Sequence, residues 1–173
     1  MSVYFYGCVT LDGYLADKNH RLDWLYQTGT TEETSYDEFF ETIDITVMGK
    51  RTFDEIADMD DLASYYGRTE NYVFTHQEEL SSPLFKPVAG DVTAFIASLP
   101  KDKNCWIVGG NTLLAPLLDK DMVDQLIIQF APVLLGEGIP LFTQNEALKR
   151  FDLKAVHKYG QFAELVLEKR HGE

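Results

Sequence analysis

The chain of 173 residues has little cysteine and no long apolar run. Its only cysteines, Cys8 and Cys105, lie in separate apolar segments without a CxxC pair, so we interpret both as buried reduced thiols and expect no metal site. The first residues lack a basic leader followed by an apolar stretch, and no later segment has the apolar length that a membrane span requires. We therefore expect a cytoplasmic protein without a membrane partner.

Basic residues are also scarce, since 15 Lys and Arg face 28 Asp and Glu and the formal net charge is -13. A surface with this charge repels polyanions, so nucleic acid is not an expected partner. The hydrophobic content of 45% is enough to build a core, and the length suits one domain. No repeat or linker-like stretch divides the chain, and we predict a single domain over residues 1–173.

Short apolar runs alternate with helical patterns along the chain. Runs rich in β-branched and aromatic residues predict strands at 3–9, 44–49, 71–75, 105–110 and 125–133. Helix starts are predicted at Thr30 with Glu33, Thr52 with Glu55, Asp91 and Asn111. This order is typical of an α/β domain with a mostly parallel sheet. Residues 151–159 and 162–170 alternate polar with apolar around Gly160, which predicts a closing antiparallel hairpin and a mixed sheet.

Two further segments, 11–30 and 57–70, are predicted to be long loops, which are often functional in compact domains. Of the histidines, His20 and His171 are expected in a surface loop and the tail, and His157 on the final hairpin. None has a second histidine, cysteine or carboxylate at a spacing typical of metal ligands.

Two strand-to-helix junctions carry the strongest functional signal. One is Gly109–Gly110, and the other is the run from Gly49 through Lys50 and Arg51 to Thr52. A helix N-terminus offers free backbone N–H groups and the positive end of its dipole to an anion, and glycine lets a phosphate approach closely. Because open α/β sheets bind ligands at the carboxyl ends of their strands, the two junctions together suggest a dinucleotide with an extra phosphate.

Each junction alone has a plainer interpretation. The paired glycines could form only a tight turn, and the basic pair could be solvated side chains on a surface. The chain has neither a GxGxxG segment after its first strand nor a GxxxxGK[ST] segment, so neither the Rossmann nor the P-loop signature applies. A different nucleotide-binding fold is therefore expected.

Five segments in this order resemble the dihydrofolate-reductase-like superfamily: VTLDGYLA (9–16), TVMGKRTFDEI (46–56), NYVFT (71–75), WIVGGNTLLAPLL (106–118) and VDQLIIQFAPVLLGEGIPLF (123–142). The closer resemblance is to the reductase domain of the bifunctional riboflavin-biosynthesis deaminase-reductase, and it covers nearly the whole chain. The resemblance implies a three-layer α/β fold with a mixed eight-stranded sheet, NADPH as cofactor and, often, a homodimer.

The resemblance also implies roles for the cofactor residues. Gly49, Lys50, Arg51 and Thr52 would grip the adenosine 2′-phosphate and the adjacent phosphate, with Thr75 and His76 flanking the adenine. The turn that carries the pyrophosphate near the nicotinamide would comprise Val108, Gly109, Gly110, Asn111, Thr112 and Leu113. Leu15 would lie beside the nicotinamide ring. Trp24 matches a tryptophan near the end of the mobile active-site loop, and its alternative role is that of a core aromatic.

The substrate side departs from the family pattern. Tyr6 and Val108 stand where the riboflavin branch has a lysine and a glutamate. The inward stripe of the first helix is expected to comprise Tyr36, Phe39, Phe40 and Ile43, without a carboxylate. The proton could come from solvent or from one of four candidates, Asp12, Tyr6, Glu33 and Asp37. Glu33 and Asp37 could instead be solvated charges, and Asp12 could instead only stabilise the Asp-Gly turn. Arg68 resembles an arginine that grips a folate tail, and the expected substrate pocket comprises Trp24, Tyr36, Phe40 and Arg68.

These expectations combine into an NADPH-dependent reductase that transfers hydride to a small pteridine- or pyrimidine-like heterocycle. Two alternatives stay open, a non-catalytic protein that binds the nucleotide and a scaffold that binds none. The apolar segment 126–135 is expected to be a core strand or, alternatively, part of a homodimer interface.

Overall fold

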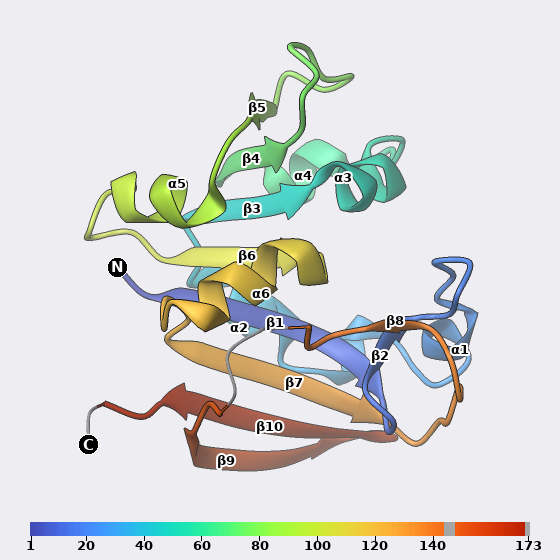
Figure 1. Ribbon diagram of the computed structural model, residues 1–173. Coiled ribbons are helices and arrows are strands. Elements are labelled where there is room, and N and C mark those ends of the chain that lie inside the picture. Colours follow the sequence, from blue (N-terminus) through green and yellow to red (C-terminus); the bar gives the residue numbers. More distant parts are fainter. Residues whose placement is uncertain (144–147, 172–173) are drawn as a thin grey trace.

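In the computed structural model, which describes residues 1–143 and 148–171, strands far apart in the sequence form one sheet (Figure 1). Among the described residues this sheet has eight strands in the order β5-β4-β3-β6-β1-β7-β10-β9. The pairs from β5 through β7 are parallel, whereas β10 is antiparallel to β7 and β9. The strands are β1 Val3–Thr10, β3 Ile45–Gly49, β4 Glu70–Phe74, β5 Phe85–Val88, β6 Cys105–Gly109, β7 Gln125–Ala131, β9 Phe151–Tyr159 and β10 Phe162–Lys169.

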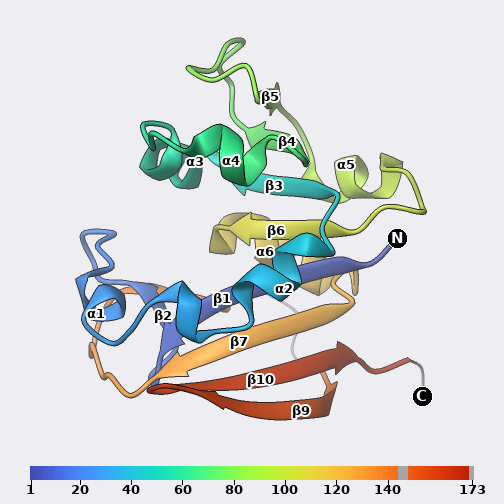
Figure 2. The same ribbon diagram turned by 180° about the vertical axis from the view of Figure 1, so that it is seen from behind.

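Helices cover both faces of the sheet and give the fold three layers. The pair α5 (Val92–Ser98) and α6 (Asn111–Asp119) lies on one face, as Figure 1 shows, and α2 (Tyr36–Glu41), α3 (Lys50–Ile56) and α4 (Leu62–Tyr66) lie on the other, as Figure 2 shows. Burial on both faces explains why β3 is mostly apolar, because Val47 packs in the core beneath α5 and α6 while Met48 packs against α3 and α4.

The predicted α/β class, the mostly parallel sheet and the closing hairpin are confirmed. The hairpin turns at Gly160, whose φ of 58° is readily adopted by glycine. The first part of segment 126–135 is a core strand, because β7 lies between β1 and β10 and exposes only 1% of Leu126 and 2% of Ile128. Leu126 and Ile128 are therefore core residues, whereas Ile127 and Phe130 of the same strand are half-buried.

Both predicted loops contain short elements, and that expectation was wrong. Residues 11–30 include β2 (Tyr14–Ala16) and α1 (Asp23–Tyr26), and residues 57–70 include α4. The strand β2 pairs with β8 (Ile139–Pro140), which ties the loop after β1 to the segment after β7. These elements have two to five residues each, too few for a readable periodicity.

The predicted helix starts are confirmed in part. Asp91 caps α5 by accepting a hydrogen bond from the backbone N–H of Thr93 at 2.8 Å. Glu33 accepts the backbone N–H of Thr30 at 3.4 Å, at the start of a 3-10 turn over Thr31–Glu33. Thr52 is not a cap, because β3 runs directly into α3 and Gly49 occupies the N-cap position. Asn111 is likewise the first helical residue after the cap Gly110. Among the described helices, none is long and apolar enough to cross a membrane.

Candidate active site

A cleft of about 550 Å³ opens where β1, β3 and β6 end, at the carboxyl edge of the parallel strands. Strand β3 continues into α3 and β6 continues into α6, so two helix N-termini border the cleft. The lining includes most of the predicted cofactor residues, namely Leu15, Gly49, Lys50, Arg51, Thr52, Val108, Gly109, Gly110, Asn111, Thr112 and Leu113. The tertiary structure thus brings together segments from three separate parts of the sequence.

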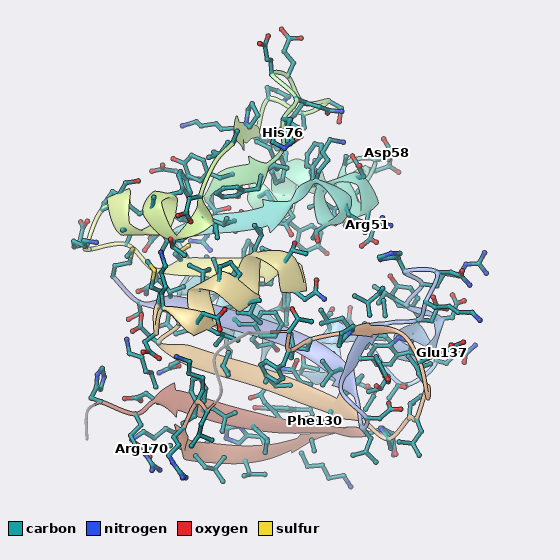
Figure 3. All side chains as sticks on the ribbon, in the orientation of Figure 1. Arg51, Asp58, His76, Phe130, Glu137 and Arg170 are labelled. Atoms are coloured by element: carbon teal, nitrogen blue, oxygen red, sulfur yellow. The ribbon has the colours of Figure 1, made fainter. Side chains whose placement is uncertain are left out.

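Thr75 and His76 lie outside this lining. They follow Phe74, the last residue of β4 and itself part of the cleft wall. The Thr75 backbone N–H donates to Val88 O at 2.9 Å, which places this residue on the side of β5. Figure 3 shows His76 apart from Arg51. The assignment of Thr75 and His76 to the adenine end of the cofactor remains a prediction.

The two cations at the start of α3 differ in their surroundings. The Lys50 ammonium pairs with Asp54 one helical turn on and lies 5.7 Å from the centre of the Phe53 ring. Arg51 is exposed, and within the described residues its guanidinium forms no ion pair within 4.0 Å. Arg51 is therefore the cation that a second phosphate would meet with its donors uncommitted.

The glycines of the two junctions leave space for a ligand. A Cβ added at Gly49 or Gly110 would meet no protein atom within 4 Å, although both residues line the cleft. At Gly109 the added atom would lie 3.1 Å from Thr52 Oγ1, so this glycine permits close packing of the two junctions. Open space beside two helix N-termini fits a bound pyrophosphate and phosphate. These residues therefore fit the dinucleotide that the sequence suggests.

The Gly49→Ala change tests this fit. Gly49 has φ -79° and ψ 164°, which alanine adopts, so the free energy of unfolding is expected to fall by no more than about 1 kcal/mol. The added methyl group enters the cleft, and NADPH affinity is expected to fall about tenfold or more. Thermal unfolding and fluorescence titration of the same sample separate the two effects. Unchanged NADPH affinity would mean that no phosphate lies against this turn.

Among the cleft residues that the sequence analysis did not assign to the site are an imidazole and a carboxyl group. His20, expected in a surface loop, lines the cleft, and so does Glu55. Burial raises the pKa of the Glu55 carboxyl, while Arg51 and His20 act in the opposite direction. Glu55 lies four residues after Arg51, so helical spacing could have revealed it, whereas His20 is brought in only by the fold of its loop.

A second cavity, of about 470 Å³, adjoins the first and is mostly aromatic and apolar. It lies on the face of the sheet that α2 covers, between that helix and β1, β6, β7 and β10. Its wall comprises Tyr6, Gly7, Cys8, Leu25, Tyr26, Gly29, Thr30, Thr31, Thr34, Tyr36, Trp106, Gln129 and Phe162. Three of these residues, Gly7, Cys8 and Leu25, also line the cleft, so the two spaces share a boundary.

The predicted residue Tyr6 supplies a polar group to this aromatic wall. Its hydroxyl lies 3.1 Å from Ser35 Oγ and 3.4 Å from Thr34 Oγ1. Burial raises the pKa of Tyr6, and the nearby Glu164 raises it further. Tyr36 is the second predicted residue in the wall, and burial raises its pKa as well. Both side chains therefore remain protonated phenols near neutral pH.

Three predicted acidic candidates lie outside both cavity linings. Asp12 accepts hydrogen bonds from Thr10 Oγ1 at 2.6 Å and from the Gly136 backbone N–H at 2.9 Å. These bonds lower its pKa, so it holds the loop after β7 and is poorly suited to donate a proton. Glu33 and Asp37 are exposed, in line with the solvated charges considered as their alternative. The prediction that these three side chains face substrate is not matched by their positions.

Three residues of the expected substrate pocket, Trp24, Phe40 and Arg68, make contacts that stabilise the fold. Trp24 is 7% exposed and packs with Ala131 and Phe162, which fits its alternative role as a core aromatic. Phe40 stacks on Tyr36 with ring centres 5.9 Å apart, behind the cavity wall. Arg68 donates to Phe40 O at 2.6 Å and to Ile43 O at 2.9 Å, so it satisfies carbonyls at the end of α2. These two bonds leave other N–H donors of the exposed guanidinium for a ligand, so a tail-binding role for Arg68 stays a prediction.

The sequence analysis missed the polar residues that back the aromatic cavity. Gln129 and Glu164 are each 2% exposed, and they come from β7 and β10. A polar residue at a buried position of an apolar strand is a readable signal in QLIIQFA, but no pattern indicates that Gln129 meets Glu164. Among the described residues, no three His, Cys, Asp or Glu side chains are placed to hold a metal ion.

The eight-stranded sheet and its flanking helices define a dihydrofolate-reductase-like fold, as the resemblance implies. The family model of the RibD C-terminal domain matches residues 2–164, and the chain therefore belongs to this family.

Relatives of known sequence or structure agree with this assignment. The uncharacterized protein YwjB of Bacillus subtilis (strain 168) is 31% identical over 163 residues, which cover 92% of this chain and 93% of YwjB. A crystal structure of a Shewanella sp. PV-4 protein, assigned to riboflavin biosynthesis by its name alone, has a TM-score of 0.86 and 26% identity, covering 99% and 100% of the two chains.

A bifunctional protein of Thermotoga maritima shares the fold. Its name describes a diaminohydroxyphosphoribosylaminopyrimidine deaminase and 5-amino-6-(5-phosphoribosylamino)uracil reductase. The TM-score is 0.73 at 14% identity, and the match covers 98% of this chain but 56% of the bifunctional protein.

Proposed function

We propose that this protein is an NADPH-dependent reductase that acts on a small pteridine- or pyrimidine-like heterocycle. The activity would resemble that of a 5-amino-6-(5-phosphoribosylamino)uracil reductase or a dihydrofolate reductase. The observation that carries the proposal is the boundary of Gly7, Cys8 and Leu25 between a phosphate-suited cleft and an aromatic cavity. A cofactor and a flat substrate bound in these spaces would meet at that boundary.

NADPH, when bound, supplies the hydride, and the protein supplies position and exclusion of water. Arg51 and the α3 N-terminus would hold the phosphate that distinguishes NADPH from NADH. Gly110 and the α6 N-terminus would hold the pyrophosphate. Tyr36 and Trp106 would hold a planar ring in the second cavity, whose wall keeps bulk water from one side of it. We also propose a cytoplasmic location and a homodimer, as the resemblance implies.

A non-catalytic protein that binds NADPH is the second candidate. Tyr6 and Val108 favour it, because the resemblance expects a lysine and a glutamate at these positions. In this structure Tyr6 hydrogen-bonds to Ser35. Val108 is half-buried against two apolar clusters, one that contains Met48 and one that contains Trp106. Neither side chain carries a charge toward the shared boundary.

NADPH oxidation with a panel of candidate substrates separates the two functions. The panel would contain 5-amino-6-(5-phosphoribosylamino)uracil, its dephosphorylated form and dihydrofolate, and the measurement is the loss of reduced-nicotinamide absorbance. We expect saturable oxidation with at least one pyrimidine or pterin, and a lower rate at limiting NADPH in Gly49→Ala. Tight NADPH binding without oxidation of any panel compound would favour the non-catalytic alternative. Absence of NADPH binding would refute both.

A further inference from the structure

A buried acidic residue stands behind the polar wall of the aromatic cavity. Glu164 on β10 is 2% exposed, and its register partners are Gln129 on β7 and His157 on β9. The three side chains form a row across adjacent strands, because residues paired in register project from the same face of a sheet. Gln129 also lines the cavity, which links the row to the space where a ligand would lie.

The hydrogen bonds of Glu164 have a fixed direction when it is a carboxylate. A carboxylate only accepts, so Ser35 Oγ and Gln129 Nε2, both 2.6 Å from Oε2, donate to it. This direction also fixes the Gln129 amide, whose carbonyl end is turned away from Glu164. The other carboxylate oxygen, Oε1, lies 3.3 Å from His157 Nδ1.

The negative charge of Glu164 also sets the direction of the hydrogen bond between Ser35 and Tyr6 in the cavity wall. Ser35 has given its only hydroxyl hydrogen to Glu164, so it can only accept from the Tyr6 hydroxyl at 3.1 Å. Within the wall, the Tyr6 hydroxyl can therefore donate its hydrogen to Ser35 Oγ or to Thr34 Oγ1 at 3.4 Å. What Tyr6 offers to a ligand is its oxygen lone pair. A buried negative charge thus makes the polar part of this wall an acceptor surface.

We propose that Glu164 determines specificity by making the aromatic cavity select a ring that presents N–H donors, above all a ring with a protonated nitrogen. The inference rests on the proposed function, because it takes this cavity as the substrate site. Glu164 acts through Ser35, Tyr6 and Gln129, so it is a positioning residue. Its charge is buried, and charges interact more strongly in the interior of a protein than in water.

Other titratable groups face Glu164 from neighbouring strands. His157 and Tyr159 lie on β9, and Tyr6 lies on β1. His157 is the neighbour that can become a cation, and its side chain is 46% exposed. When protonated, it would offset the charge of Glu164.

Calorimetric titration with two matched probes tests the proposal. One probe is 2,4-diaminopyrimidine, which carries N–H donors and becomes a cation on protonation. The other is 2,4-dimethoxypyrimidine, which has the same ring and no N–H group. In the wild-type protein we expect the diamino probe to bind at least about tenfold more tightly, a difference of about 1.4 kcal/mol. Glu164→Gln keeps the size of the side chain and removes its charge, so the ratio should fall below about threefold.

Controls make each outcome decisive. Glu38→Gln carries the same substitution at an exposed site on α2 and should keep the wild-type ratio. Tyr6→Phe removes the acceptor oxygen and should also reduce the ratio, which tests the proposal if Glu164→Gln fails to fold. An unchanged ratio in the folded Glu164→Gln protein, equal binding of both probes by the wild type, or binding of neither would each overturn it.

The titrations are made without NADPH, and NADPH binding is measured on the same samples. Equal binding of both probes by the wild-type protein, with intact NADPH binding, refutes only the role of Glu164. Selective probe binding without NADPH binding refutes the proposed reductase, but it still supports the selection of N–H donors by the aromatic cavity.

Discussion

Replacement of Arg51 by alanine is expected to remove the preference for NADPH over NADH. Arg51 is exposed at the start of α3, lines the cleft and has no ion-pair partner within 4.0 Å among the described residues. A charged hydrogen bond to the 2′-phosphate contributes about 1.5–3 kcal/mol, so NADPH affinity should fall by roughly 10- to 100-fold. NADH lacks that phosphate, and its affinity should not change. Fluorescence titration with both nucleotides measures the ratio.

Two matched variants sharpen this result. Lys50→Ala should weaken NADPH binding less than Arg51→Ala, because the Lys50 ammonium already pairs with Asp54. Arg170→Ala removes an arginine that pairs with Asp152 at 2.7 Å, in a part of the molecule far from the cleft (Figure 3). It should leave both affinities unchanged. If the Arg51→Ala protein still prefers NADPH, the assignment of the 2′-phosphate to the start of α3 is wrong.

Replacement of Asn71 by leucine is expected to have the largest effect on stability. Asn71 is 1% exposed, and its Nδ2 donates to Tyr66 O at 2.8 Å, Thr69 O at 3.1 Å and Leu84 O at 3.2 Å. Its Oδ1 accepts from Thr46 Oγ1 at 2.7 Å, across the β3–β4 pair. Leucine leaves these buried groups unpaired, at a cost of about 3 kcal/mol in the free energy of unfolding. The midpoint of thermal unfolding should therefore fall by roughly 6–12 °C.

The same substitution at an exposed asparagine provides the control. Asn19 lies in the loop after β2 and is exposed, so Asn19→Leu should change the midpoint by little. Calorimetry of the three proteins gives the comparison. A midpoint for Asn71→Leu within about 2 °C of the wild type would show that the buried amide adds no net stability.

Sequence patterns located the long elements better than the short ones. Strands such as β3 and β6 are mostly apolar because both faces are covered, and this run of apolar residues is visible without the fold. The elements β2, β8, α1 and α4 are held by contacts with distant segments, such as the pairing of Tyr14 with Pro140. Their residues do not show a period of their own. Helix starts failed for a similar reason at Thr52, where the path of β3 decided that Gly49 is the cap.

The cofactor cleft was more predictable than the substrate cavity. Gly49–Lys50–Arg51 and Gly109–Gly110 each form a contiguous strand-to-helix junction, so local chemistry and the rule for parallel strands place both at one edge. The polar wall of the cavity combines Tyr6, Ser35, Gln129 and Glu164 from four separate elements or turns. Glu33 and Asp37 lie outside this cavity, whereas Glu164 from β10 lies behind its polar wall and bonds to the lining residue Gln129.

The sequence by itself determined the acidic net charge, the alternation of strands and helices, and the two strand-to-helix junctions suited to anions. These features depend on composition, periodicity and neighbouring residues. The tertiary structure alone decided which cation is unpaired, which glycines face open space and which carboxylate lies behind the aromatic cavity. These properties arise from hydrogen bonds and packing between residues as distant in the chain as Ser35 and Glu164. Sheet register pairs Glu164 with Gln129, and the packing of α2 on the sheet adds Ser35, so proximity in the chain does not reveal these contacts.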